Sequence, residues 1–372
     1  MARLLKLGVY DAAYLHCFYR DRPALVGAPY AEQHTALIAD RAASSDFWTA
    51  ALTRRGYATC DLIANAAPLQ ARWAIENGLA ADCETVFAVT AAQVAAFAPD
   101  ILLIADYSTF TPAYLRQLRA TCPSLRLIVG WCGAPYRDLT VMREWDIALS
   151  CVPEIVDEFR AAGLDTHHVD HGFEPRILKQ LAPPDSASVA FSFIGSVWQR
   201  DGYHRGRAAL LARLVEETPL EIWSPSGDTR SRRRRWLDRL RGTPQVPALA
   251  SPDRPPLYGL AMFATLRDSH VTFNSHIDIS PRSASNMRLF EATGVGACLL
   301  TDRRDNLSEL FADGSEVVSY GCADEAIEAY AWLADHPAER AAIAAAGQRR
   351  TLADHNFDRR AERLDAILGA AL

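Results

Sequence analysis

The segment Asn274–Gly296 brings together residue types that could bind a negatively charged group and a sugar. An apolar strand is expected to end at His276, a polar loop follows, and Asn286 is a good N-cap for the next helix. Arg288 then falls in the first helical turn, where a cation opposes the helix dipole at a cost of about 0.3–1 kcal/mol unless an anion lies nearby. A diphosphate at the helix start would remove this conflict, and Glu291, on the same helix face, could accept both hydroxyls of a ribose. The same spacing also fits a plain surface ion pair.

A second candidate anion site lies at the end of the apolar run that precedes residue 195. Gly195 would let a backbone N–H approach a phosphate closely, and the hydroxyl of Ser196 could donate as well. An ordinary turn between strand and helix explains this glycine equally well, and the sequence has no G-x-G-x-x-G of the usual dinucleotide site. With Arg207 on the helix expected to follow, the candidate ligand-binding residues are Gly195, Ser196, Arg207, His276, Asn286, Arg288 and Glu291.

Three residues of the N-terminal half could take a proton from a hydroxyl: Asp11, His16 and Asp106. All three follow expected strands, and the carboxyl ends of parallel strands are where ligands of such sheets bind. Each has an ordinary alternative: Asp11 could cap a helix, His16 could pack in an aromatic cluster, and Asp106 could stabilise a turn. The aromatic residues nearby could form a platform for an acceptor molecule, although core packing suits most of them: Tyr14, Phe18, Tyr19, Tyr30 and Trp73.

Short apolar runs that alternate with helical segments must position these residues. In the first half, the pattern predicts strands at 5–10, 58–64, 100–105, 125–131, 146–151 and 167–170, and helices at 32–55, 68–78, 111–121 and 153–162. The segment 174–187 contains a Pro-Pro pair and is typical of a linker. The second half predicts strands at 188–194, 220–223, 270–275, 297–301 and 315–319, helices at 204–217, 231–240, 257–267, 286–293 and 323–335, and a helical tail over 337–371.

Strands that are apolar on both faces and are separated by helices indicate parallel sheets covered on both sides. We therefore predict an α/β protein with two Rossmann-like, doubly wound domains that face each other across a cleft, and a C-terminal helical tail. The expected limits are 1–177 for the first domain, 186–356 for the second, and 357–372 for a final helix that packs back on the first domain.

Composition narrows the classes of function. The 372 residues suit two domains, and a net charge of −6 argues against a nucleic-acid partner. The cluster Arg230–Arg235 fits a solvated helix face, or else a patch for an acceptor or an anionic lipid. The eight cysteines form no C-x-x-C pair, which favours buried, reduced thiols and a cytoplasmic location. We expect no signal peptide and no membrane-spanning run, so that any membrane contact would be peripheral, at the inner face.

The run Met287–Asp302, followed by Asn306–Phe311, is similar to the donor-binding half of GT-B glycosyltransferases. It most resembles the bacterial family, sometimes labelled "glycosyl transferases group 1", that includes the spore-maturation protein CgeB. The similarity extends over further segments of the chain: Trp131–Pro135, Gly172–Phe173, Glu316–Tyr320, Ala326–Leu333, His336–Arg340 and Ala345–His355.

The resemblance implies that the second domain holds a nucleotide-sugar donor, with no bound metal, because such enzymes stabilise the leaving diphosphate with arginines, lysines and helix dipoles. Glu291 matches the later of two glutamates found in retaining members, and would contact the ribose of the donor. The earlier one would fall at Ser283, which is not acidic, so the retaining mechanism is not carried over. No D-x-D stands at a strand end, and Asp278 and Asp302 stand alone.

We therefore expect a metal-independent glycosyltransferase, of hexosyl or related type and without cofactor, that moves a sugar from a nucleotide sugar to a saccharide, lipid-linked or protein acceptor. Such an enzyme would serve the biosynthesis of cell-surface polysaccharide or glycoprotein. Two alternatives stay open. One is a nucleotide-sugar epimerase on the same fold, and the other is a non-catalytic carbohydrate- or partner-binding protein, which Ser283 in place of an acid favours. The base, sugar, acceptor, stereochemistry and oligomeric state are left open.

Overall fold

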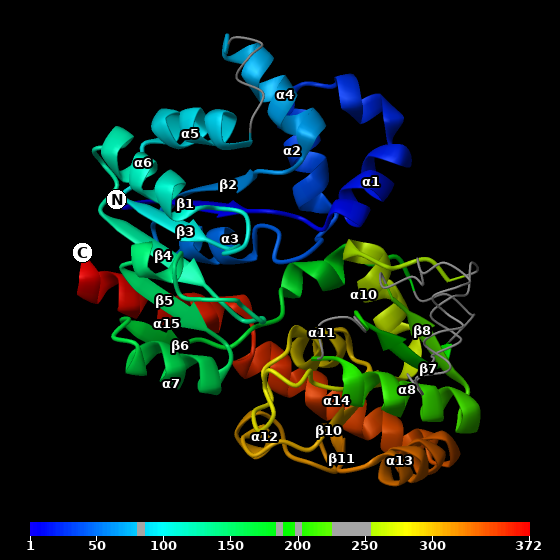
Figure 1. Cartoon of the computed structure of the whole chain (residues 1–372). Coiled ribbons are helices and arrows are strands. Elements are labelled where there is room, and N and C mark those ends of the chain that lie inside the picture. Colours follow the sequence, from blue (N-terminus) through cyan, green and yellow to red (C-terminus); the bar gives the residue numbers. More distant parts are fainter. Residues whose placement is uncertain (80–85, 184–188, 198–202, 225–253) are drawn as a thin grey trace, which may run out of the picture. The chain divides into compact units, whose positions relative to one another are not determined.

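The computed structural model describes residues 1–79, 86–183, 189–197, 203–224 and 254–372, and it consists of two units (Figure 1). The first unit is Met1–Asp170 together with Phe357–Leu372, and the second is His171–Asn356. The division lies before residue 177, the expected end of the first domain. It does so because Phe173 packs inside the second unit: a Cβ added at Gly294 would lie 2.2 Å from its ring.

The first unit is built on a parallel sheet with the strand order β2-β1-β3-β4-β5-β6. β1 lies between β2 and β3, so the chain reverses its direction across the sheet at this strand, as in a doubly wound fold. Buried aliphatic side chains dominate most of these strands, which explains why the sequence predicted them to within a few residues. The strands are β1 (Arg3–Gly8), β2 (Ala58–Ile63), β3 (Ile101–Ile104), β4 (Leu127–Trp131), β5 (Ile147–Ser150) and β6 (Thr166–His168).

The helices of the first unit agree with the sequence in part. Three were expected: α4 (Ala67–Glu76), α6 (Pro112–Thr121) and α7 (Pro153–Ala161). Two were missed, α1 (Ala12–Arg20) and α5 (Val86–Phe97). The unit also contains the short 3₁₀ helices η1 (Pro23–Gly27) and η2 (Met142–Glu144).

The single helix expected at 32–55 is wrong, because two helices, α2 (Tyr30–Ala39) and α3 (Phe47–Arg54), take its place. The backbone between them has positive φ at Arg41 (59°), Ala43 (50°) and Ser45 (31°). The break brings the carbonyl of Ser45 to the ammonium of Lys6, a buried residue of β1. Lys6 also pairs with Asp61 of β2 at 2.9 Å. A buried cation needs such partners. The free energy gained by pairing Lys6 outweighs the helical propensity of residues 40–46.

The second unit is built on a parallel sheet with the order β11-β10-β9-β7-β8. β7 lies between β8 and β9, so the direction of the chain reverses between β7 and β9. In open parallel sheets, this switch point at the carboxyl ends of the strands is the usual place for a ligand. All five strands were expected: β7 (Val189–Ile194), β8 (Leu220–Trp223), β9 (Ser269–Asn274), β10 (Cys298–Asp302) and β11 (Val318–Tyr320).

Helices cover the second sheet. α8 (Arg205–Glu217) and α13 (Ala323–Asp335) contribute to a core with Phe191, Phe273 and Leu300 of the strands. The other helices of this unit are α10 (Gly259–Arg267), α11 (Met287–Val295), α12 (Leu307–Leu310) and α14 (Pro337–Asp354), with the 3₁₀ helix η3 (Pro175–Lys179) inside the segment expected to be a linker. The helix expected at 231–240 and the cluster Arg230–Arg235 lie outside the described residues.

The C-terminal helix α15 (Phe357–Ala371) belongs to the first unit. The ring of Phe357, the first residue of α15, lies 5.1 Å from the ring of Phe47 on α3. Arg54 of α3 pairs with Asp358 of α15 at 2.5 Å. The chain therefore returns to its first unit after completing the second.

All seven cysteines in the described residues are free, and Cys83 lies outside them. Burial raises the pKa of the Cys132 and Cys298 thiols to about 12, so these two are buried, protonated thiols as the sequence predicted. Cys322 is exposed, so the expectation of burial is wrong for this residue. In the described part of the chain, no helix has the length and apolar character needed to cross a membrane.

Candidate functional site

Arg207 of α8 reaches the switch point of the second sheet. Its guanidinium donates to the carbonyl of Ser196, just after β7, at 2.9 Å, and to the carbonyl of Ser275, just after β9. Burial lowers the pKa of Arg207 to about 10, so the group still carries its charge at neutral pH. Within the described residues, no carboxylate lies at ion-pair distance from this guanidinium, although the more distant charges of Asp302 and Asp278 favour its charged form.

Arg288, in the first turn of α11, reaches the same strand end. Its Nε and Nη2 atoms donate to the carbonyl of Ile194, the last residue of β7, at 3.2 and 2.9 Å. Its Nη1 atom lies 2.7 Å from Oε2 of Glu291, and the two side chains are only 14% and 10% exposed. The pair that the spacing allowed is therefore present, but it is mostly buried and attached to β7 rather than lying on the surface.

Asn286 is the N-cap of α11, as predicted, and accepts from the backbone N–H of Leu289 at 3.4 Å. Its amide also exchanges two hydrogen bonds with Asn274 at the end of β9, at 2.7 and 3.3 Å. Asn274 in turn donates to the hydroxyl of Thr301 at 2.9 Å. This amide pair fixes the start of α11 to the carboxyl ends of β9 and β10, so Asn286 acts on the site by positioning the helix.

His276 was expected to contact the ligand, but both of its ring nitrogens are engaged by the protein. Nε2 accepts from the backbone N–H of Ser285 at 3.1 Å, so Nδ1 carries the proton that is donated to Asp302 at 2.7 Å. The backbone N–H of His276 also donates to Asp302, at 3.0 and 3.1 Å. The imidazole therefore connects β10 to the loop that leads into α11, which is a positioning role.

Asp302 belongs to this cluster of polar side chains, although the sequence suggested that it stands alone. Burial by itself would raise the pKa of this carboxyl group, but the hydrogen bonds from His276 and the charge of Arg304 outweigh burial and lower it to about 2. Arg304 lies 2.6 Å from the carboxylate and also donates to the carbonyl of Pro281. The order of the strands is the feature that could have indicated this contact. Because β9 and β10 are adjacent and parallel, the residues after β9 lie close to the last residue of β10.

Gly195 does not offer its N–H to a ligand, which corrects the interpretation drawn from the sequence. That N–H donates to the carbonyl of Trp223, the last residue of β8, at 3.1 Å. A Cβ at this position would lie 3.1 Å from the ring of Phe193, closer than side chains usually pack. The glycine therefore allows tight packing at the end of β7, while the adjacent Ser196 contributes its carbonyl to Arg207.

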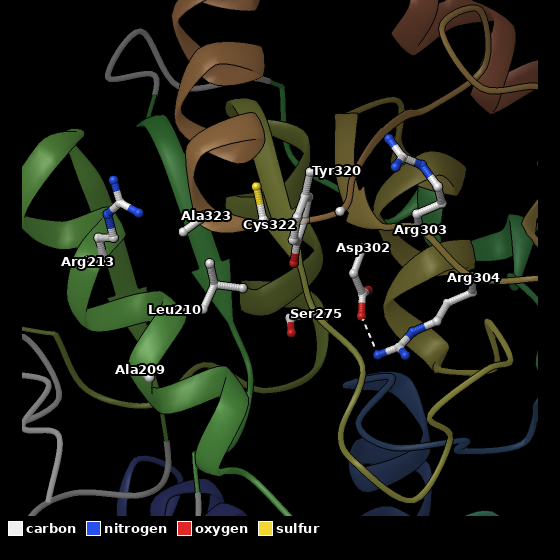
Figure 2. Close-up of a pocket in the computed structure, with 11 residues that line it drawn as sticks. Ala209, Leu210, Arg213, Ser275, Asp302, Arg303, Arg304, Tyr320, Cys322 and Ala323 are labelled. Atoms are coloured by element: carbon white, nitrogen blue, oxygen red, sulfur yellow. Dashed lines mark hydrogen bonds and ion pairs between the residues drawn. The ribbon is translucent and has the colours of Figure 1, made fainter.

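A pocket of about 490 Å³ opens beside these residues (Figure 2). Figure 2 shows Arg213 of α8 on one side, Arg303 and Arg304 on the other, and Ser275 and Asp302 between them. The arginines of the pocket are already paired: Arg213 lies 2.7 Å from Glu217, and Arg303 lies 3.1 Å from Glu325. Arg207, Arg288 and Glu291 are not among the lining residues, so this pocket and the two guanidiniums at the switch point are neighbouring features.

The candidate bases of the first unit differ in how far they are engaged. Asp11 caps α1, accepting from the N–H groups of Ala13 and Tyr14 at 2.7 and 3.1 Å. Asp106 accepts from Ser108 and Thr109 and so stabilises a turn. His16 is exposed rather than packed among aromatic rings. Among the residues that the structure describes, none forms a hydrogen bond or ion pair with its imidazole.

The aromatic residues proposed as an acceptor platform are mostly core residues. Tyr14, Phe18 and Tyr19 are buried and in ring contact, with centroids 5.7 and 5.4 Å apart. The hydroxyl of Tyr14 donates to Asp40 at 2.8 Å. Tyr30 stacks on the ring of His34 at 5.6 Å and, like Trp73, is partly buried.

The described residues contain no cluster of three or more His, Cys, Asp or Glu side chains that could hold a metal ion.

Residues 200–366 match the model of a family described as glycosyl transferase-like. The chain matches no curated protein by sequence.

The likeness to solved structures extends over the full length. Sucrose-phosphate synthase from Thermosynechococcus elongatus shares 12% identity, with all of both chains covered and a TM-score of 0.58. HepE from Anabaena, in complex with UDP-glucose, shares 12% identity over all of both chains, with a TM-score of 0.57. This chain has the GT-B fold of glycosyltransferases. A further GT-B neighbour is AviGT4, a glycosyltransferase involved in avilamycin A biosynthesis, at 11% identity, 98% of this chain and 96% of that chain covered, and a TM-score of 0.52.

In this GT-B chain, the glycosyl transferase-like match covers the described elements of the second unit from α8 to α14. The two guanidiniums at the switch point, the capped start of α11 and the His276–Asp302 pair all come from these elements. The part of the chain that resembles glycosyltransferases by sequence is therefore the part in which charged side chains gather at the carboxyl edge of a sheet.

Proposed function

We propose that this protein transfers a sugar from a nucleotide-sugar donor, and that its second unit holds the diphosphate of the donor between Arg207 and Arg288. The observation that carries this proposal is the pair of guanidiniums on carbonyls at the end of β7. Burial is the main cause of the lowered pKa of Arg207; the repulsion between the two guanidiniums adds to it, while the charges of Asp302 and Asp278 act in the opposite direction. An anion between them relieves the repulsion, and charged hydrogen bonds to phosphate oxygens are the strong ones.

The same arrangement suits the chemistry of sugar transfer. When the bond between the sugar and the diphosphate breaks, negative charge develops on the leaving oxygen, and fixed cations stabilise that charge most effectively. Both guanidiniums are held by backbone carbonyls, so they need little rearrangement. Glu291 uses Oε2 for Arg288, which leaves Oε1 to accept a ribose hydroxyl.

The similarity to HepE, whose structure was solved with UDP-glucose, supports a nucleotide sugar as the donor class. We assign the proton acceptor to His16, because its imidazole is exposed while Asp11 and Asp106 are engaged by their own turns. The acceptor hydroxyl gives its proton to His16, its oxygen bonds to the sugar carbon, and the diphosphate leaves with the electrons of the broken bond. Metal independence remains part of the proposal.

A thermal-shift screen of the full chain against UDP, GDP, dTDP and CMP sugars tests this proposal. A donor at 100 times its Kd should stabilise the protein by about 2.7 kcal/mol. Glu291→Ala should reduce the response to that donor, whereas Arg350→Gln should not. Arg350 is the control, because its substitution also breaks an arginine–carboxylate ion pair within one helix, the pair with Asp354 on α14, outside the proposed site. If no nucleotide sugar or nucleoside diphosphate stabilises the protein, the proposal is wrong.

A further inference from the structure

The first unit contains a pocket of about 420 Å³ beside His16, the proposed proton acceptor. α1, the 3₁₀ helix η1 and the segment after β2 form it. Its volume is within the range of sites for small organic molecules. Its apolar lining includes Leu15, Val26, Ala67 and Pro68, and its polar lining includes His16.

The walls of this pocket are apolar, and most of its polar groups are already bonded. The hydroxyl of Tyr19 donates to Gln33 at 3.0 Å. The amide of Asn65 accepts from the N–H of Tyr10 at 2.9 Å and donates to its carbonyl at 2.7 Å. Arg20 pairs with its neighbour Asp21 at 2.7 Å. Among the polar side chains of this lining, His16 is the one that forms no hydrogen bond or ion pair with any described residue.

This chemistry discriminates between classes of acceptor. A saccharide carries several hydroxyls, and each one that is buried without a partner costs free energy. A molecule with an apolar body and one hydroxyl loses nothing against Leu15 and Pro68, and it gains the burial of its apolar surface. Val26, which is 49% exposed, extends the apolar wall toward solvent and would be covered by such a molecule.

We infer that this pocket binds an acceptor with an apolar body and a single hydroxyl, an aglycone of the phenol or alcohol class, and that the hydroxyl faces His16. The inference rests on the proposed function for the transfer step alone. In that step the acceptor O–H bond breaks, its proton goes to the imidazole, its oxygen bonds to the sugar, and the nucleoside diphosphate leaves. Binding of the acceptor to the pocket requires no donor.

Equilibrium binding to the full chain, measured by saturation-transfer NMR without donor, tests the inference. The probes are 4-methylumbelliferone, which is apolar with one hydroxyl, and methyl β-glucoside, a saccharide. Ala67→Trp fills the pocket from the start of α4, and Ala113→Trp is its control, an exposed alanine at the start of α6. We expect 4-methylumbelliferone to bind the unaltered chain and Ala113→Trp alike, and to bind Ala67→Trp at least about tenfold more weakly.

Two results would overturn the inference: equal binding of 4-methylumbelliferone to both tryptophan variants, or tighter binding of methyl β-glucoside that Ala67→Trp abolishes. Parallel titrations with nucleoside diphosphates keep the two proposals apart. If these bind and 4-methylumbelliferone does not, the acceptor class is wrong while the donor proposal stands. If 4-methylumbelliferone binds as expected and no nucleoside diphosphate binds, the pocket stands and the transfer reaction does not.

Discussion

The carboxyl edges of the two sheets differ in how their polar side chains are used. At the edge of the second sheet, charged groups bond across elements: Arg207 joins the ends of β7 and β9, and His276 joins β10 to the loop before α11. At the edge of the first sheet, Asp11 and Asp106 accept hydrogen bonds from residues two or three positions further along the chain. His16 lies there in a mostly apolar pocket.

This difference matches two kinds of recognition. A diphosphate has the same charge and shape in every nucleotide sugar, so fixed cations suit it. An acceptor is recognised by the shape and polarity of its body, for which apolar walls and one base suffice. Substitutions at the edge of the second sheet should therefore impair binding of the donor, and substitutions at the edge of the first sheet should impair use of the acceptor.

The largest effect is expected at the first edge. His16→Gln should lower kcat by about 10²–10⁴-fold, the usual contribution of a general base, with unchanged affinity for the nucleoside diphosphate. Steady-state kinetics and calorimetry on the same preparation measure the two quantities. His167→Gln, at a histidine that pairs with Asp165 in the same unit, is the control. An undiminished kcat in His16→Gln would remove the base from the account.

At the second edge, Arg288→Met should destabilise the protein by about 3 kcal/mol, because Glu291 would remain mostly buried without its partner. Urea unfolding measures the change. The double variant Arg288→Met/Glu291→Gln should recover much of the stability but not the binding of a nucleoside diphosphate. If the double variant is as unstable as the single one, the stability of the site does not depend on the ion pair.

A smaller effect concerns pH. The pKa of Asp302 is lowered to about 2, so its contribution to stability is present above the ordinary carboxyl pKa of about 3.9 and is lost as the pH falls toward 2. Between pH 5 and pH 3, linkage gives a loss of about 1 kcal/mol from this group. Over the same interval of pH, the free energy of unfolding of Asp302→Asn should fall by about 1 kcal/mol less than that of the unaltered protein. If urea unfolding shows the same loss of stability in both proteins, His276 and Arg304 do not stabilise the ionised carboxylate of Asp302.

The smallest effect is expected from metal removal. Excess EDTA should leave the rate of transfer unchanged, because the proposal assigns the leaving charge to Arg207 and Arg288. Loss of activity that Mg²⁺ or Mn²⁺ restores would mean that a metal takes this role.

Sequence reasoning predicted those features that depend on local pattern. The strands were predictable because buried aliphatic side chains dominate most of them, and the cap at Asn286 because its type and place suit a helix start. α5 was missed because its own residues are mostly apolar on every face, so its sequence shows no helical periodicity. The break between α2 and α3 depends on Lys6, a residue distant in sequence.

The candidate site was predictable in membership but not in roles. Arg207 and Arg288 were named, yet their carbonyl partners lie on other strands and give no local signal. His276 was named as a contact, although its bonds to Asp302 and Ser285 leave it a positioning role. Such roles depend on which strands are neighbours, and only the fold supplies that information.

The central claim is that a diphosphate lies between two arginines at the end of β7. Calorimetry with the nucleoside diphosphate that gives the largest thermal shift, and with its parent nucleoside, tests this claim on the full chain and on Arg207→Gln. The account predicts that the variant binds the diphosphate about 10–100-fold more weakly, as expected for a lost charged hydrogen bond, and the nucleoside equally well. Equal affinity of both proteins for the diphosphate would contradict it.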